Sequence, residues 1–112
     1  MIRWAVVVRM AGDAELIYVA DQCDWDEDKG GCQPACAEGD VLLDASGRVY
    51  RLTRTVDGRV VPEATGATRT LIEVLGLVKA HAAQSGCCCV AKLHAASIRQ
   101  AIEMVKSLDE QQ

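Results

Sequence analysis

The alternation of apolar and polar residues predicts strands in the first part of the chain. A strand over residues 2–10 would carry an apolar face formed by Ile2, Trp4, Val6, Val8 and Met10. A second apolar run over residues 15–20 follows a short segment that contains Gly12. Two such runs around a glycine-containing turn are typical of a β-hairpin, so we expect the chain to begin with one.

Three further strands are expected between residues 40 and 61. Residues 40–44 and 48–56 form the first two, and a turn at Ala45-Ser46-Gly47 separates them. Asp57-Gly58 predicts a two-residue hairpin turn, which needs positive φ at both central positions, and it leads into a returning strand at residues 59–61. Pro62 has no N–H to donate, so this strand is predicted either to lie at the edge of the sheet or to end there.

From residue 68 the apolar spacing changes to that of a helix. Thr70 and Glu73 fit a capping box, and Gly86 stands where a helix ends. The inward stripe of this helix is predicted to be Leu71, Val74, Leu75, Val78 and Ala82. Residues 87–92 then form a short apolar run that indicates a buried strand.

A second capping box, at Ser97 and Gln100, predicts the start of the last helix. Arg99 and Glu103 would pair at i,i+4 on its exposed face. Its inward positions are Ile98, Ala101, Ile102, Val105 and Leu108. The predicted fold is therefore α+β: a β-hairpin, a short acidic loop or helix, a three-stranded meander, and a helix-strand-helix unit whose two helices pack on one face of the sheet.

The segment over residues 21–40 fits none of these patterns. It holds seven acidic residues against Lys29 alone, and a short helix at about 24–29 is expected within it. The calcium-loop template fails in both registers, because Lys29 or Ala37 stands where glycine or the bidentate glutamate is required. A solvated acidic loop is the simpler interpretation.

Composition and charge narrow the class of protein. With 112 residues, half of them apolar, the chain is expected to form a single domain over residues 1–112. No apolar run is long enough to span a membrane, and the stretch between Arg3 and Arg9 is too short for an export signal. We therefore expect a cytoplasmic protein with reduced cysteines.

The six cysteines divide into two groups. Cys87, Cys88 and Cys89 are consecutive and are interpreted as small buried side chains, because free cysteines are often buried. Adjacent cysteines are too close to form a disulfide, and in a regular strand Cys87 and Cys89 would lie at the long limit of the feasible distance. Cys32 and Cys36 have the spacing of a zinc knuckle, and Cys23 lies upstream. A site of Cys23, Cys32 and Cys36 is kept as an alternative, although a second knuckle is missing.

Other candidate sites are weaker. Arg48, Arg51, Arg54 and Arg59 cluster on the second hairpin with only Asp57 against them, but the acidic composition does not favour nucleic acid as a partner. His81 would lie at the rim of the apolar stripe of the first long helix, in its last turns, and His94 lies between the last predicted strand and the last helix. No catalytic motif accompanies either histidine, so no catalytic or cofactor-binding residue is assigned.

Short segments along the whole chain resemble a small bacterial family of domains of unknown function. They are Ile2-Arg3-Trp4, residues 12–18, residues 40–50 and residues 86–92. The resemblance implies a free-standing bacterial domain and supplies no functional residue. Two hypotheses follow. The first is a non-enzymatic cytoplasmic module that binds a protein partner or forms a homodimer, and for which neither nucleic acid nor a membrane is expected as a partner. The second is a thiol-based or zinc-binding protein that uses Cys23, Cys32 and Cys36.

Overall fold

A computed structural model describes residues 2–11, 15–27, 39–84, 86 and 93–110. Its sheet has five antiparallel strands in the order β2-β1-β3-β4-β5. They are β1 (Val6–Arg9), β2 (Leu16–Val19), β3 (Val41–Leu43), β4 (Arg48–Arg54) and β5 (Val60–Thr68). The helices are α1 (Gln22–Asp26), α2 (Leu71–Gln84) and α3 (Ile98–Glu110). The expected α+β fold is confirmed, with the first hairpin and the meander in one sheet.

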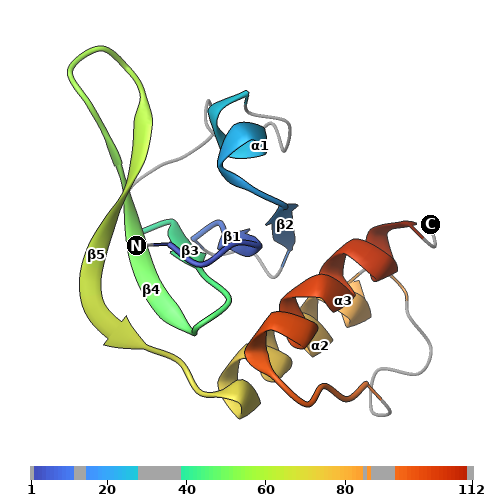
Figure 1. Ribbon diagram of the computed structural model, residues 1–112. Coiled ribbons are helices and arrows are strands. Elements are labelled where there is room, and N and C mark those ends of the chain that lie inside the picture. Colours follow the sequence, from blue (N-terminus) through green and yellow to red (C-terminus); the bar gives the residue numbers. More distant parts are fainter. Residues whose placement is uncertain (1, 12–14, 28–38, 85, 87–92, 111–112) are drawn as a thin grey trace.

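The two faces of the sheet have separate apolar cores. Val7 and Leu43 point to the face that α2 and α3 cover, where they pack against Val78 and Ile102. The two helices lie side by side on this face, as expected from their single apolar stripes (Figure 1). Strand alternation sends the intervening side chains to the other face. The alternation predicted for the first strand is thus confirmed, although the strand itself covers only Val6–Arg9.

The opposite face is covered by the short helix α1. Trp25 is 4% exposed and packs in a cluster with Val6, Val8, Leu52 and other strand residues. Asp21 caps the helix by accepting a hydrogen bond from the Asp24 N–H at 2.8 Å. The helix expected at about 24–29 therefore exists but begins and ends earlier, because its cap is Asp21.

Both long helices begin at the predicted caps. Glu73 N–H donates to the Thr70 hydroxyl at 3.2 Å, and Thr70 N–H donates to the Glu73 carboxylate at 3.1 Å. These contacts with Thr70 lower the pKa of Glu73 below its ordinary value. At α3 the Gln100 N–H donates to the Ser97 hydroxyl, but the Gln100 side chain accepts from the N–H of Ala96 rather than Ser97. The second capping box is therefore correct in only one of its two bonds.

The strand that follows Gly58 is much longer than predicted. β5 has nine residues and does not end near Pro62, which pairs with Leu52 inside it. Of the two alternatives predicted from Pro62, the position at the edge of the described sheet is confirmed. The turn before it also differs from the prediction: Thr55 N–H donates to the Arg59 carbonyl at 2.7 Å and Gly58 N–H to the Thr55 carbonyl at 2.9 Å. These bonds close a three-residue loop, in which only the last residue needs the φ of +86° that Gly58 has. The strand predicted at 87–92 lies outside the described residues.

Candidate binding site at the edge of the sheet

Among the described strands, β5 has a neighbour on one side only, because it ends the strand order next to β4. All its residues from Glu63 to Thr68 are exposed. A strand in this position presents unpaired N–H and C=O groups along its outer side, and such an edge is a template for pairing with another chain. The direction of each backbone group follows from the register with β4.

The register assigns Val60, Pro62 and Ala64 to the outer side of β5. In an antiparallel pair, hydrogen-bonded and non-hydrogen-bonded residue pairs alternate. The pair of Thr55 and Arg59 is hydrogen-bonded, so the pair of Leu52 and Pro62 is not. Consistently, the Leu52 N–H donates to the Asp40 carbonyl on the opposite side of β4. The backbone groups of the three β5 residues therefore point away from β4, and Pro62 has no N–H to offer there.

An irregularity between β4 and β5 creates a pocket, which we call the bulge pocket. The pairing shifts between Arg48 and Tyr50, so the single residue Val49 stands opposite Thr65–Ala67 on the other strand. The Thr65 hydroxyl replaces a backbone donor at the Val49 carbonyl, at 2.8 Å. Gly66 adopts a φ of +80°, and its missing side chain, with the small side chains around it, leaves a pocket of about 250 Å³. Bulges of this kind often re-aim side chains beside functional sites.

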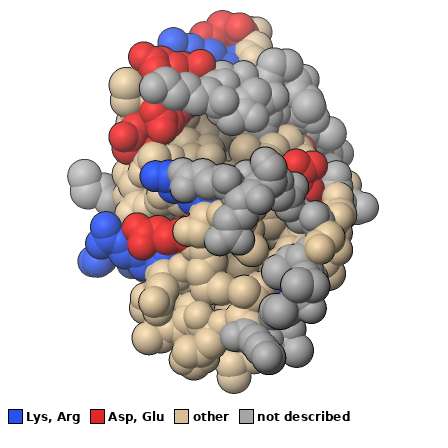
Figure 2. All heavy atoms as spheres, turned by 90° about the vertical axis from the view of Figure 1, so that its right-hand side faces the viewer, with Lys and Arg blue, Asp and Glu red and all other residues tan. Residues whose placement is uncertain are grey.

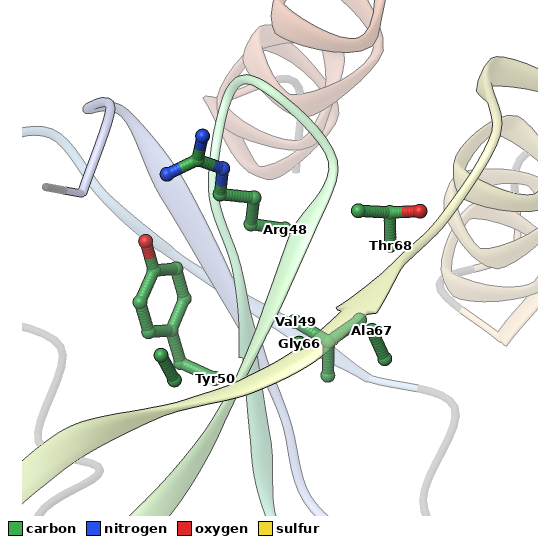
Figure 3. Close-up of a pocket in the computed structure, with 7 residues that line it drawn as sticks. Arg48, Val49, Tyr50, Gly66, Ala67 and Thr68 are labelled. Carbon is green, nitrogen blue, oxygen red and sulfur yellow. The ribbon is translucent and has the colours of Figure 1, made fainter.

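The bulge pocket combines a mainly apolar lining with one charged group. Its lining residues are Arg48, Val49, Tyr50, Ala64, Gly66, Ala67 and Thr68. Figure 3 shows the side chains of Arg48 and Tyr50 standing on the same side of β4, with Gly66 and Ala67 on the neighbouring strand. Tyr50 is 6% exposed, whereas Arg48 is exposed. The pocket can therefore receive an apolar group beside a cation.

A second, smaller hollow lies at the other end of β5, and we call it the α1 hollow. It measures about 130 Å³ and is lined by residues of α1, among them Trp25 and Asp26, and by residues 59–62. Asp26 and Arg59 line it together, so the acidic helix and the basic hairpin meet within one chain. Val60, Pro62 and Ala64 alternate onto one face of β5, which links the two hollows along this strand.

The basic hairpin carries more opposing charge than expected. Arg51 pairs with Glu63 at 2.7 Å, so the prediction that only Asp57 opposes the arginines is wrong, because β5 extends past Pro62. Four arginines still face two carboxylates between residues 48 and 68. On the face shown in Figure 2, most of the Asp and Glu side chains lie in the upper half, and the described residues of the lower half are largely uncharged. The β4–β5 hairpin is thus a positively charged element of an acidic protein.

The buried polar residues have structural partners. His81 is 3% exposed, so its expected place at the rim of the apolar stripe is wrong. Its Nδ1 accepts a hydrogen bond from the Leu16 N–H at 3.0 Å. Asp40 and Asp44 stand at the two ends of β3 and accept hydrogen bonds from the Ala11 and Arg3 N–H groups, respectively. These contacts extend the β1–β3 pairing beyond both ends of the ladder. None of the three residues opens onto either hollow described above.

The structure shows only part of the proposed cysteine site. Cys23 lies exposed on α1, whereas Cys32 and Cys36, like Cys87, Cys88 and Cys89, fall outside the described residues. His94 is exposed near the start of α3. Within the part of the chain that the structure describes, no three His, Cys, Asp or Glu residues come together as metal ligands. Nor is any described helix long and apolar enough to cross a membrane.

The comparisons with known proteins agree with this fold. A solved NMR structure of a protein from Shewanella amazonensis is similar, with a TM-score of 0.68 and 24% sequence identity, over 96% of this chain and 90% of that chain. At this identity the likeness shows the fold alone. No curated protein matches the sequence. The model of the DUF4144 family, described as a protein structure with unknown function, matches residues 4–105. The chain belongs to the DUF4144 family.

Proposed function

We propose that this chain is a non-catalytic protein-interaction domain that binds an extended segment of another protein along the outer side of β5. The observation that carries the proposal is the nine-residue edge strand, exposed from Glu63 to Thr68 and bordered by two hollows. Strand addition takes its affinity from backbone hydrogen bonds and its selectivity from pockets for alternate side chains. The excess of arginines on the hairpin favours an acidic segment.

The experiment is a selection of peptides from a random library on the immobilised protein, followed by nuclear magnetic resonance with the labelled chain. We expect acidic peptides, and we expect their strongest amide shifts within Val60–Thr68. Slower amide exchange at Val60 and Ala64 should accompany binding, since both N–H groups point outward. A selection that yields no binding peptide would refute the proposal, as would amide shifts confined to α2 and α3.

Replacing Pro62 with alanine is expected to strengthen binding of the selected peptides about two- to tenfold. The substitution adds one outward N–H, and one hydrogen bond contributes about 0.5–1.5 kcal/mol. The ladder with β4 stays intact because the Leu52 N–H already bonds to Asp40. Isothermal titration calorimetry measures the change.

The control is Val56→Ala. Val56 is fully exposed in the turn between β4 and β5, and it lines neither hollow. This variant should bind the peptides as the parent chain does. Equal affinities of the parent and the Pro62→Ala chain would contradict strand addition at this edge.

A further inference from the structure

The bulge pocket gives the proposed ligand a more specific chemistry, and this inference rests on the proposed function. Arg48 is exposed at the rim of the pocket, and none of the described residues forms an ion pair with it. Its neighbours differ: Arg51 pairs with Glu63, and Arg54 donates to the Gly58 carbonyl at 2.9 Å. Arg48 is therefore the arginine of β4 whose guanidinium remains available to a ligand.

Asp44 forms no ion pair with the Arg48 guanidinium. Its Oδ2 lies 3.5 Å from the hydroxyl of Tyr50, which lines the pocket. Asp44 is fully buried, and its oxygens accept hydrogen bonds from backbone N–H groups and the Ser46 hydroxyl. An arginine at the edge of a pocket, whose guanidinium forms no ion pair, can bind a ligand carboxylate through two parallel hydrogen bonds.

The geometry of an added strand sets the spacing of the two ligand groups. Ala64 contributes both to the lining of the pocket and to the outward backbone of β5. A segment paired there would present alternate side chains to this face, with about 7 Å between residues i and i+2. One of these side chains can enter the apolar pocket, while the other reaches the rim beside Arg48.

We propose that the bulge pocket receives an apolar side chain of an extended peptide added to β5, and that Arg48 pairs with a carboxylate two residues away. A pocket of about 250 Å³ admits one aliphatic side chain. The carboxylate can come from an acidic side chain or from the end of the partner chain, since both present the same two oxygens. Arg48 thus selects the carboxylate of the peptide, and the small residues of the bulge select its apolar side chain.

The test uses a terminally blocked peptide with a leucine and a glutamate separated by one residue, titrated to about 1 mM into the labelled full chain. We expect shifts at Ala64–Thr68 and at the Arg48 side chain. Replacing the glutamate with glutamine should weaken binding about tenfold, as should Arg48→Gln, and the two losses should not add. A peptide that ends in a free carboxylate at the same position distinguishes the two sources of the acid.

Arg51→Gln is the control, because it removes the same charge from the same strand on the opposite face. It should leave the affinity unchanged, which separates recognition by Arg48 from the general charge of the hairpin. If the peptides bind at β5 but Arg48→Gln and Arg51→Gln act alike, the Arg48 assignment is wrong and strand addition stands. If the leucine-glutamate peptide produces no shift at β5, the bulge pocket proposal is overturned, and only the library selection then decides the proposed function.

Discussion

Replacing Gly47 with alanine is expected to destabilise the fold by about 3 kcal/mol or more, whereas Gly58→Ala should cost about 1 kcal/mol. Both glycines have a φ of +86°, a conformation in which a Cβ atom is strained. They differ in their surroundings. A Cβ atom at Gly47 would lie 2.5 Å from the Arg69 carbonyl oxygen and 2.8 Å from Ile98 Cδ1, while a Cβ atom at Gly58 would meet nothing within 4 Å.

The contact at Gly47 cannot relax easily because it involves backbone on both sides. Gly47 O accepts a hydrogen bond from the Arg69 N–H at 2.7 Å, which ties the β3–β4 turn to the segment between β5 and α2. Moving Arg69 would therefore break this bond and disturb the start of α2. Equilibrium unfolding in urea, followed by circular dichroism, gives both free energies. Equal losses for the two variants would show that only the backbone conformation matters at Gly47.

Local signals predicted the elements whose ends are decided locally. The alternation around Val6–Arg9 assigned every side chain to the correct face, because one register buries apolar residues on both sides of the strand. The Thr70–Glu73 cap was predicted for a similar reason, since all its partners lie within four consecutive residues. Both predictions needed no knowledge of distant contacts.

The second half of β5 could not be predicted in this way. Residues 63–68 carry small or polar side chains, four of them (Glu63, Ala64, Gly66 and Ala67) of low strand propensity, and all six residues are exposed in the structure. Their conformation is fixed by pairing with β4, through contacts such as Arg51 with Glu63 and Thr65 with Val49. The isolated Gly66 was the one available signal, because a glycine inside a strand indicates a bulge. The bulge pocket lies in this half of β5, so the sequence pattern does not predict it either.

The burial of His81 likewise depends on a distant contact. Its partner is the backbone of Leu16, which is 65 positions away in the sequence. The helical stripe placed His81 at the boundary between buried and exposed positions, and only the position of β2 beside α2 decides between them. An imidazole nitrogen that accepts a hydrogen bond from a strand N–H is sufficient to explain a histidine here.

Replacing Asp44 with asparagine is expected to lower the free energy of unfolding at neutral pH by about 2–3 kcal/mol. Hydrogen bonds to an ionised acceptor are worth more than those to a neutral one, and Asp44 accepts them from the N–H groups of Arg3, Ser46 and Arg48. These donors fix the N-terminal segment beside the β3–β4 turn. An asparagine side chain keeps one acceptor and turns an NH₂ group toward the other donors.

The loss should depend on pH in a defined direction. Burial raises the pKa of Asp44, but the hydrogen bonds from the Ser46 side chain and from the three N–H groups outweigh it, so the pKa lies below its ordinary value of 3.8. The folded state then binds fewer protons than the unfolded chain in acid. The stabilisation is fully present above about pH 5 and is lost as the pH falls through the lowered pKa.

The measurement compares urea unfolding of the two chains at several pH values from neutral to strongly acidic. The difference between the parent and Asp44→Asn should be constant near neutrality and should shrink below about pH 4. Asp26→Asn is the control, since Asp26 lies exposed on α1 and its removal changes the net charge equally. A difference that persists unchanged into acid would mean that the ionised carboxylate is not the source of the stability, and that Asp44 acts only through its shape.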